Sequence, residues 1–238
     1  MANLDAFEIR DRGSAFVANV YPASTPDAAR RAQIHLKHVA HTTRPASHEI
    51  AAWRCMVLQR GKTGLGGPDD FELVAGSDDD GEKYAGGRVL KVMQAEGVID
   101  AVVVVSRWFG GEMLGPARFD HVETCAREVC RTFRLKDDMA TAVSTLKSLD
   151  DVLASLRKQL APLQTRPEKA DGTSTLAPKK AADPYSALET SLDIAKAKRL
   201  ITARENSIRS VKLALKKARA SALDSDAAAQ STQPQTEA

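Results

Sequence analysis

The sequence predicts a mixed α/β-type domain followed by a helical C-terminal extension. Apolar, strand-like segments alternate with amphipathic, helix-like segments over residues 14–134. A stretch rich in proline, lysine and alanine, with almost nothing to bury, follows at residues 161–184. Beyond it, residues 185–220 contain neither proline nor glycine and consist of helix-tolerant residues.

The first predicted elements are a strand, a helix and a second strand. Residues 14–20, SAFVANV, alternate and are rich enough in strand-forming residues to predict a strand. A helix is expected after it, with Thr25 as the N-cap and Pro26 in the first helical position. Residues 49–59 predict the second strand, because an apolar run there is bounded by polar segments.

The middle of the chain predicts a loop, a short helix, a strand and a longer helix. Residues 60–82 are rich in Gly, Pro and Asp and predict a long loop, which in a compact domain is usually functional or mobile. Residues 85–97 suit a short helix that ends at Gly97. The run AVVVVS at 101–106 predicts a strand buried on both faces, and residues 116–133 predict an amphipathic helix.

These elements predict one folded domain and four following segments. The domain covers residues 7–140, and a helix over 141–160 is expected to pack on it. Residues 161–184 are expected to be a flexible linker, and residues 185–220 a basic amphipathic helix. Its heptad-like seam is thin, which favours a single amphipathic helix over a coiled coil. Residues 221–238 are expected to be a disordered tail.

Charge is distributed unevenly along the chain. Residues 1–140 hold 18 Lys and Arg against 20 Asp and Glu, a balance of −2, whereas residues 141–238 hold 16 against 11, a balance of +5. The longest apolar run falls far short of the roughly 20 residues that span a bilayer, so no membrane partner is predicted. No secretory signal is evident and the three cysteines have no metal-like spacing, so we expect a cytoplasmic protein.

The stretch VVVVSRWFGGEMLGPARFDHV, residues 102–122, carries an unusual concentration of glycines and arginines. Glycine N–H groups beside a helix N-terminus favour an anion, and flanking arginines would strengthen that preference. Alternatively, the glycines permit tight turns while the arginines pair with the acidic run DDDGE, and the residue types do not decide between the two. The residues that would form such an anion- or partner-binding site are Arg88, Arg107, Gly110, Gly111, Gly115 and Arg118.

The acidic run at residues 78–82 has two interpretations. Clustered carboxylates can bind Mg²⁺ or Ca²⁺, although the EF-hand pattern is absent. They can also form ion pairs with Arg88 and Arg107 and cap the next helix, which is the favoured interpretation. His35 and His38 lie one helical turn apart, but no further ligand pattern completes a site, so no metal or cofactor is predicted. No nucleophile–base pattern is recognisable, and no catalytic residue is predicted.

Four segments, SAFVANV, ASHEIAAWR, DDDGEKYAGGRVLKVMQ and VVVVSRWFGGEMLGPARFDHVETCAR, resemble the IMPACT family in order and approximate spacing. The ending GPARFDHV resembles its eukaryotic branch more than its bacterial, YigZ-like members. This resemblance covers roughly residues 7–134 and implies a two-layer α+β sandwich similar to a module of ribosomal proteins. Family-motif positions include His48, Asp79, Asp80, Gly81, Glu82, Trp108 and Phe109.

The resemblance also implies a function and partners. Similar eukaryotic proteins regulate translation under amino-acid starvation by competing for the ribosome-associated activator of the initiation factor 2α kinase, and some associate with actin. Such regulators usually carry an N-terminal RWD domain, which we expect to be lacking because the family motif begins near residue 14. Glu49 stands where asparagine is common, and Lys83 replaces a small or polar residue.

Three classes of function therefore remain open. The leading hypothesis is a noncatalytic regulator that binds the activator or the kinase itself. The second is a ribosome- or RNA-binding protein that uses the Gly-Arg loop and the basic helix, which carries nine cations and one acid over 194–219. Those cations are Lys196, Lys198, Arg199, Arg204, Arg209, Lys212, Lys216, Lys217 and Arg219. The third is an enzyme acting on a phosphorylated substrate, with Asp80 or Glu82 as base.

Overall fold

The computed structural model describes residues 6–164 and 183–230. The chain divides into two compact units, with the division between Leu135 and Lys136. The first unit contains a β-sheet and its covering helices, and the described elements of the second unit are all helices.

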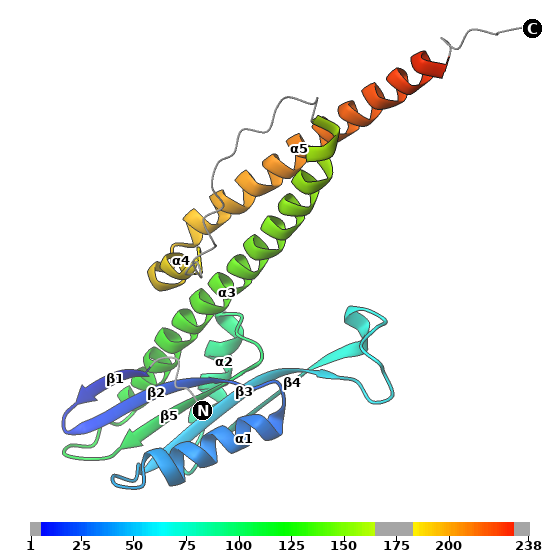
Figure 1. The fold of residues 1–238 in the computed structure, drawn as a ribbon. Coiled ribbons are helices and arrows are strands. Elements are labelled where there is room, and N and C mark those ends of the chain that lie inside the picture. Colours follow the sequence, from blue (N-terminus) through cyan, green and yellow to red (C-terminus); the bar gives the residue numbers. More distant parts are fainter. Residues whose placement is uncertain (1–5, 165–182, 231–238) are drawn as a thin grey trace, which may run out of the picture. The chain divides into compact units, whose positions relative to one another are not determined.

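The first unit is built on one five-stranded antiparallel sheet (Figure 1). In spatial order its strands are β1 (Ala6–Asp11), β2 (Ser14–Pro22), β5 (Ala101–Trp108), β3 (His48–Leu58) and β4 (Phe71–Asp78). Every neighbouring pair runs antiparallel, and β5 lies at the centre between β2 and β3. A single turn of 3₁₀ helix, Pro68–Asp70, precedes β4.

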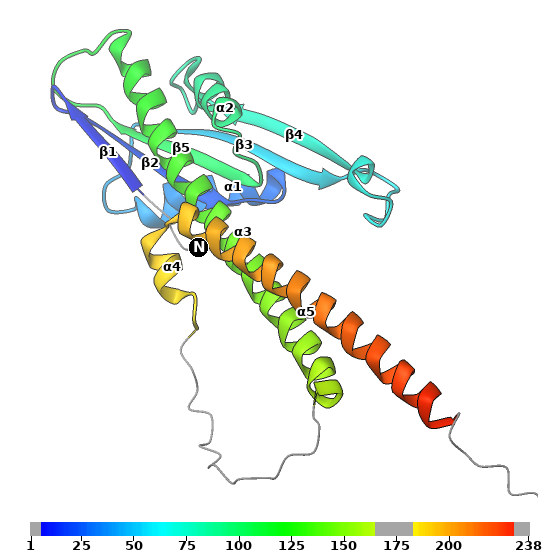
Figure 2. The ribbon, with the colours of Figure 1, turned by 90° about the horizontal axis from the view of Figure 1, so that it is seen from above.

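Helices cover both faces of this sheet. In Figure 1, α2 (Ala85–Ala95) and the first turns of α3 (Ala117–Gln164) lie above it, and α1 (Pro26–His35) lies below it. Figure 2, seen from the upper side, shows α2 and α3 in front of the strands. One turn of π-helix, Leu36–Ala40, continues α1.

Strand β5 contributes to two separate hydrophobic cores. Val103 and Val105 pack with the residues of α2 and α3, whereas Val102 and Val104 pack with the residues of α1. This division follows from strand geometry, because successive side chains point to opposite faces of a sheet. The predicted burial of this strand on both faces is confirmed.

The α+β class with a C-terminal helical extension is confirmed. The α/β type that the alternation of elements suggests by itself is wrong in its usual sense, because no two neighbouring strands are parallel. Helix α1 adds a partial layer on the second face of the sandwich, where Ala29, Ala32 and Leu36 are buried.

Two predictions about individual elements are wrong. Residues 60–82 do not form one long loop, because β4 occupies residues 71–78 as an edge strand paired with β3. The helices expected over 116–133 and 141–160 are one continuous helix, α3. The residues between them, 134–140, contain no glycine or proline that would stop a helix.

The second unit comprises the rest of α3, the short helix α4 (Ser186–Ser191) and α5 (Ile194–Gln230). Its core combines residues of all three helices: Met139, Ala142, Val143, Leu146, Tyr185, Leu188 and Ala197. Asp150 of α3 accepts hydrogen bonds from the Tyr185 hydroxyl and from Nε of Arg204, the latter at 2.5 Å.

The boundaries of this helical unit differ from the sequence prediction. The helix expected over 185–220 is interrupted at Leu192, whose φ is +50°. Helix α5 extends to Gln230, past the predicted end. Most of the predicted linker, residues 165–182, and the last eight residues, 231–238, lie outside the described residues. Among the described helices, none is both long and apolar enough to cross a membrane.

Candidate functional site

The acidic run at residues 78–82 joins β4 to α2 and contacts residues from four other elements of the first unit. Each of its four carboxylates has hydrogen-bond partners within the protein. These partners come from α1 and the π-helical turn that continues it, from β3 and β5, and from the beginnings of α2 and α3. The carboxylates of the run therefore link the sheet to its helices through hydrogen bonds and ion pairs.

Glu82 is buried between the two arginines of the glycine-rich stretch. Arg107 donates from Nη1 to Oε2 of Glu82, and Arg118 donates from Nε to Oε1 at 2.7 Å. Arg118 also donates from Nη1 to the carbonyl oxygen of Gly115 at 2.6 Å. Burial raises the pKa of Glu82, but the hydrogen bonds from Arg118 and Arg107 outweigh it, and the net pKa lies below its ordinary value. Glu82 is therefore ionised at neutral pH.

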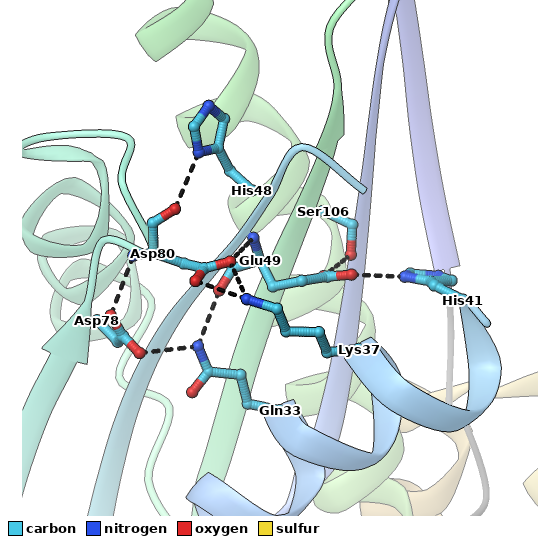
Figure 3. A network of polar contacts seen from close by, with 8 residues as sticks. All are labelled: Gln33, Lys37, His41, His48, Glu49, Asp78, Asp80 and Ser106. Atoms are coloured by element: carbon cyan, nitrogen blue, oxygen red, sulfur yellow. Dashed lines mark hydrogen bonds and ion pairs between the residues drawn. The ribbon is translucent and has the colours of Figure 1, made fainter. Parts of the chain in front are cut away.

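Asp78 and Asp80 connect this loop to α1 and β3 (Figure 3). The Asp80 carboxylate accepts from the Glu49 backbone N–H at 2.8 Å and from Nζ of Lys37 at 2.8 and 2.9 Å. Asp78 accepts from the Asp80 backbone N–H and from the side-chain amide of Gln33, both at 3.0 Å. The pKa of Asp78 is lowered, first by the backbone hydrogen bond and then by Gln33.

Asp79 caps the beginning of α2, as predicted. Its two carboxylate oxygens accept from the backbone N–H groups of Tyr84, at 2.9 Å, and Gly86, at 2.8 Å. Gly86 is required at this position, because a Cβ there would lie 2.9 Å from the carbonyl oxygen of Asp78. The predicted pairing of Arg88 with the acidic run is wrong, since Arg88 pairs with Glu123 of α3 at 2.6 Å.

The pair Gly110–Gly111 lies against the turn between β1 and β2. Gly111 has φ +68°, and a Cβ at this residue would lie 2.2 Å from the carbonyl oxygen of Arg12. The hydroxyl of Ser14 donates to the carbonyl oxygen of Gly110 at 3.1 Å. These two glycines therefore allow two turns of backbone to touch, which is the structural alternative that the sequence left open.

A second buried carboxylate, Glu49, was not identified from the sequence. Its side chain is 1% exposed and accepts a hydrogen bond from the Ser106 hydroxyl, while Nδ1 of His41 lies 2.7 Å from Oε1 (Figure 3). Glu49 lies in a strand among apolar residues, and this placement was the available signal, because a buried carboxylate requires partners. Gln33 and Lys37, which complete the network with Asp78 and Asp80, gave no such signal.

His48 lies between the two carboxylate networks. Its Nδ1 is 2.9 Å from the carbonyl oxygen of Asp80, and its Nε2 is 3.7 Å from Oε2 of Glu82. This position on β3, beside β5, follows from the strand register that places His48 opposite Arg107.

A hollow of about 270 Å³ opens beside this group. Its lining residues are His48, Glu82, Arg107, Phe109, Met113, Leu114, Gly115 and Arg118, and we call it the Glu82 hollow. Six of the residues predicted as site or motif positions therefore line it: His48, Glu82, Arg107, Phe109, Gly115 and Arg118. Arg88 and Trp108 do not; the indole N–H of Trp108 donates to the carbonyl oxygen of Arg44 at 3.0 Å. Within residues 6–164 and 183–230, no cluster of three or more His, Cys, Asp or Glu is arranged to hold a metal ion.

Half of the chain matches a known protein family. The model of the Impact N-terminal domain matches residues 12–130, which is half of the chain. The chain belongs to the IMPACT family. This match lies entirely within the first unit and includes every residue that lines the Glu82 hollow.

Several curated IMPACT proteins are similar over the same region. Protein IMPACT of Mus musculus is 37% identical over 124 residues, which are 51% of this chain and 35% of that protein. The Protein IMPACT homolog of Saccharomyces cerevisiae is 38% identical over 120 residues, which are 50% of this chain and 42% of that protein. The match therefore spans well under half the length of these relatives.

One solved structure with a similar sequence is described as the two-domain translational regulator Yih1. It is 35% identical, and the aligned region covers 53% of this chain and 44% of that chain, with a TM-score of 0.34.

Proposed function

We propose that this chain is a noncatalytic regulator of translation that acts in the response to amino-acid starvation. The observation that carries the proposal is the match of residues 12–130, which contain four of the five strands, to the Impact N-terminal domain, supported by 38% identity to the Protein IMPACT homolog of Saccharomyces cerevisiae. The candidate site is consistent with a noncatalytic role. In an enzyme Glu82 would be a candidate base. Two arginines pair with it and lower its pKa, so it is a poor proton acceptor.

The proposed mechanism is competition for a shared partner in the cytoplasm. By analogy with the family, the chain would bind the ribosome-associated activator of the initiation factor 2α kinase, or the kinase itself, and so restrain the kinase. Binding to actin is a further property that the family suggests.

A reconstituted kinase reaction tests this proposal. The full chain is added to ribosomes, uncharged tRNA, the activator and the kinase, and phosphorylation of initiation factor 2α is measured. We expect phosphorylation to fall as the chain is added, and the loss to be reversed by excess activator. Unchanged phosphorylation would refute the regulatory role, and inhibition that also occurs without the activator would place the target on the kinase.

A second candidate function, binding to ribosomal RNA, is supported by the composition and exposure of α5. Eight of the nine cations between residues 194 and 219 are exposed, and the ninth, Arg204, is paired with Asp150 at 2.5 Å. Exposed cations spaced along a helix can neutralise several phosphates, and such binding weakens steeply with salt. The one aromatic residue in the described part of the second unit, Tyr185, is buried, so stacking on bases is not expected. The salt dependence of binding to ribosomal RNA tests this candidate.

A further inference from the structure

The Glu82 hollow has an excess of positive charge. Two arginines, Arg107 and Arg118, line it together with His48, and Glu82 is the only carboxylate among its lining residues. Glu82 is shared between the two guanidinium groups, so it neutralises one of them and leaves the other uncompensated. An anion of single charge would balance the hollow.

The hollow also has unused hydrogen-bond donors. Arg107 is 6% exposed, and its Nε–H is buried without a hydrogen-bond partner among the described residues. Buried polar groups are rarely left unpaired in folded proteins, and among the described residues this holds for two side-chain donors, Nε of Arg54 and Nε of Arg107, of which only Arg107 belongs to a residue that lines the hollow. Arg118 and His48 are more accessible, with side chains 30% and 27% exposed, so their remaining donors can be reached from solvent.

An apolar rim surrounds these cations. Phe109 is 55% exposed and Met113 is 84% exposed, and both line the hollow next to the buried Leu114. The guanidinium carbon of Arg107 lies 5.6 Å from the centre of the Phe109 ring. An aromatic residue, a methionine and arginines gathered at one place are the composition that is enriched in the centres of protein interfaces.

The size and charge of the hollow favour one kind of occupant. Its volume of about 270 Å³ is below the roughly 300–1,000 Å³ typical of small-molecule sites. A doubly charged phosphate would bring two negative charges next to the ionised Glu82 and leave the hollow with a net negative charge. A carboxylate would bring one negative charge, which balances the hollow. A carboxylate side chain flanked by an apolar residue matches both the donors and the rim.

We propose that the Glu82 hollow is the docking site for an acidic peptide segment of a partner protein. The carboxylate of an Asp or Glu is received by Arg118 and Arg107, and a neighbouring apolar side chain packs on Phe109 and Met113. The inference rests on the proposed regulatory function only in taking the partner to be a protein, and it is tested without any component of translation.

The test is an NMR titration of the full chain with capped tripeptides. The probe is acetyl-Leu-Glu-Phe-amide, compared with the neutral acetyl-Leu-Gln-Phe-amide, with acetyl-Gly-Glu-Gly-amide and with inorganic phosphate. We expect the probe to shift the Nε–H signals of Arg107 and Arg118 and to bind about tenfold more tightly than either comparison peptide, because each lacks one of the two contacts. Equal binding of the Glu and Gln peptides, shifts confined to α5, or tighter binding of phosphate would each overturn the proposal.

Variants of the rim separate docking from folding. Because Phe109 and Met113 are exposed, the double substitution Phe109→Ala and Met113→Ala should leave the melting temperature nearly unchanged. It should reduce the affinity for acetyl-Leu-Glu-Phe-amide to that for acetyl-Gly-Glu-Gly-amide. The matched control is Leu65→Ala, since Leu65 is 92% exposed and does not line the hollow. Equal losses in the rim variant and the control would also overturn the proposal. A failure of the kinase reaction together with a positive titration would leave the docking site in place and reject only the regulatory function.

Discussion

At the scale of single residues, the main feature of this domain is that one carboxylate holds two arginines. Arg107 and Glu82 are both 6% exposed, and Arg118 approaches the same carboxylate from the first turns of α3. Removing one partner of such a buried group leaves charges that are desolvated and uncompensated, which costs more than the intact pair contributes. The stability of the domain should therefore depend strongly on Glu82.

We expect Glu82→Gln to lower the free energy of unfolding by about 3–5 kcal/mol, because it leaves Arg107 buried without a counter-charge. Glu123→Gln is the matched control. It removes the ion pair with Arg88, whose side chains are 42% and 30% exposed, and should cost less than about 1 kcal/mol. Urea unfolding of both variants measures the difference, and similar losses would show that the burial of Glu82 is unimportant.

The lowered pKa of Glu82 also predicts how stability depends on pH. A carboxyl group whose pKa is lower in the folded state stabilises the fold above its unfolded pKa, near the ordinary value of 4.5. That stabilisation is lost as the pH falls from there through the folded pKa. We expect the Glu82→Gln variant to lose less stability than the parent between pH 5 and pH 2, measured by thermal unfolding. An identical pH profile would contradict this assignment. Asp78, whose pKa is also lowered, contributes to both proteins equally.

The glycine pair gives a further test at single residues. Gly111→Ala should destabilise the domain by at least about 1–2 kcal/mol, because Gly111 has a positive φ and its new Cβ would meet the Arg12 carbonyl oxygen. Gly87→Ala is the control, since a Cβ at Gly87 in α2 meets nothing within 4 Å. Alanine there should stabilise the helix by up to about 1 kcal/mol. Opposite shifts of the two melting temperatures are expected, and a neutral Gly111→Ala would mean that the two turns can separate.

At the scale of whole elements, the sequence predicted the parts whose pattern is set by burial. The strand over 14–20, the helix beginning at Pro26 and the strand over 101–106 all have buried faces, and the structure contains them. Strand β4 was missed because it is an edge strand. Its apolar residues Phe71 and Leu73 are partly exposed, and flanking Gly, Pro and Asp residues resemble a loop.

The candidate site was predictable only in part, for a related reason. Residue types predicted that the acidic run would cap a helix and bind an arginine, since both are short-range electrostatic preferences. They could not predict which arginine binds the acidic run, because Arg88 pairs instead with Glu123, 35 positions away in the sequence. The same applies to Glu49 and Ser106, which lie 57 positions apart and meet only through the pairing of β3 with β5.

A substitution in the core of the helical unit tests whether α5 depends on that core. Leu146 of α3 is fully buried among residues of α4 and α5. Leu146→Ala should cost about 2–5 kcal/mol locally and should speed hydrogen exchange in the first turns of α5. Val152→Ala is the control, because Val152 lies on the same helix and is 44% exposed. Unchanged exchange in α5 of the Leu146 variant would mean that α5 does not depend on this core.

At the scale of the whole molecule, the positive charge lies in the C-terminal part of the chain, where residues 141–238 carry +5 against −2 for residues 1–140. If this charge binds ribosomal RNA, affinity should fall with salt according to the number of phosphates contacted, with a log-log slope of about −0.7 for each on single strands. If the first unit binds the RNA instead, the salt dependence of binding should not change when cations of α5 are removed. A substitution within α5 therefore distinguishes binding by α5 from binding by the first unit.

The triple substitution Lys212→Gln, Lys216→Gln and Lys217→Gln removes three exposed cations from α5. The salt slope of binding to ribosomal RNA should become shallower by about 2, because three phosphate contacts are lost. The matched control is Arg60→Gln, Lys83→Gln and Lys91→Gln, which removes the same charge from exposed positions of the first unit and should leave the slope unchanged. Filter binding between 50 and 200 mM salt measures both. If the two triple variants change the slope equally, the contribution is that of net charge alone. Only a change confined to the α5 variant identifies that helix as the RNA-binding element.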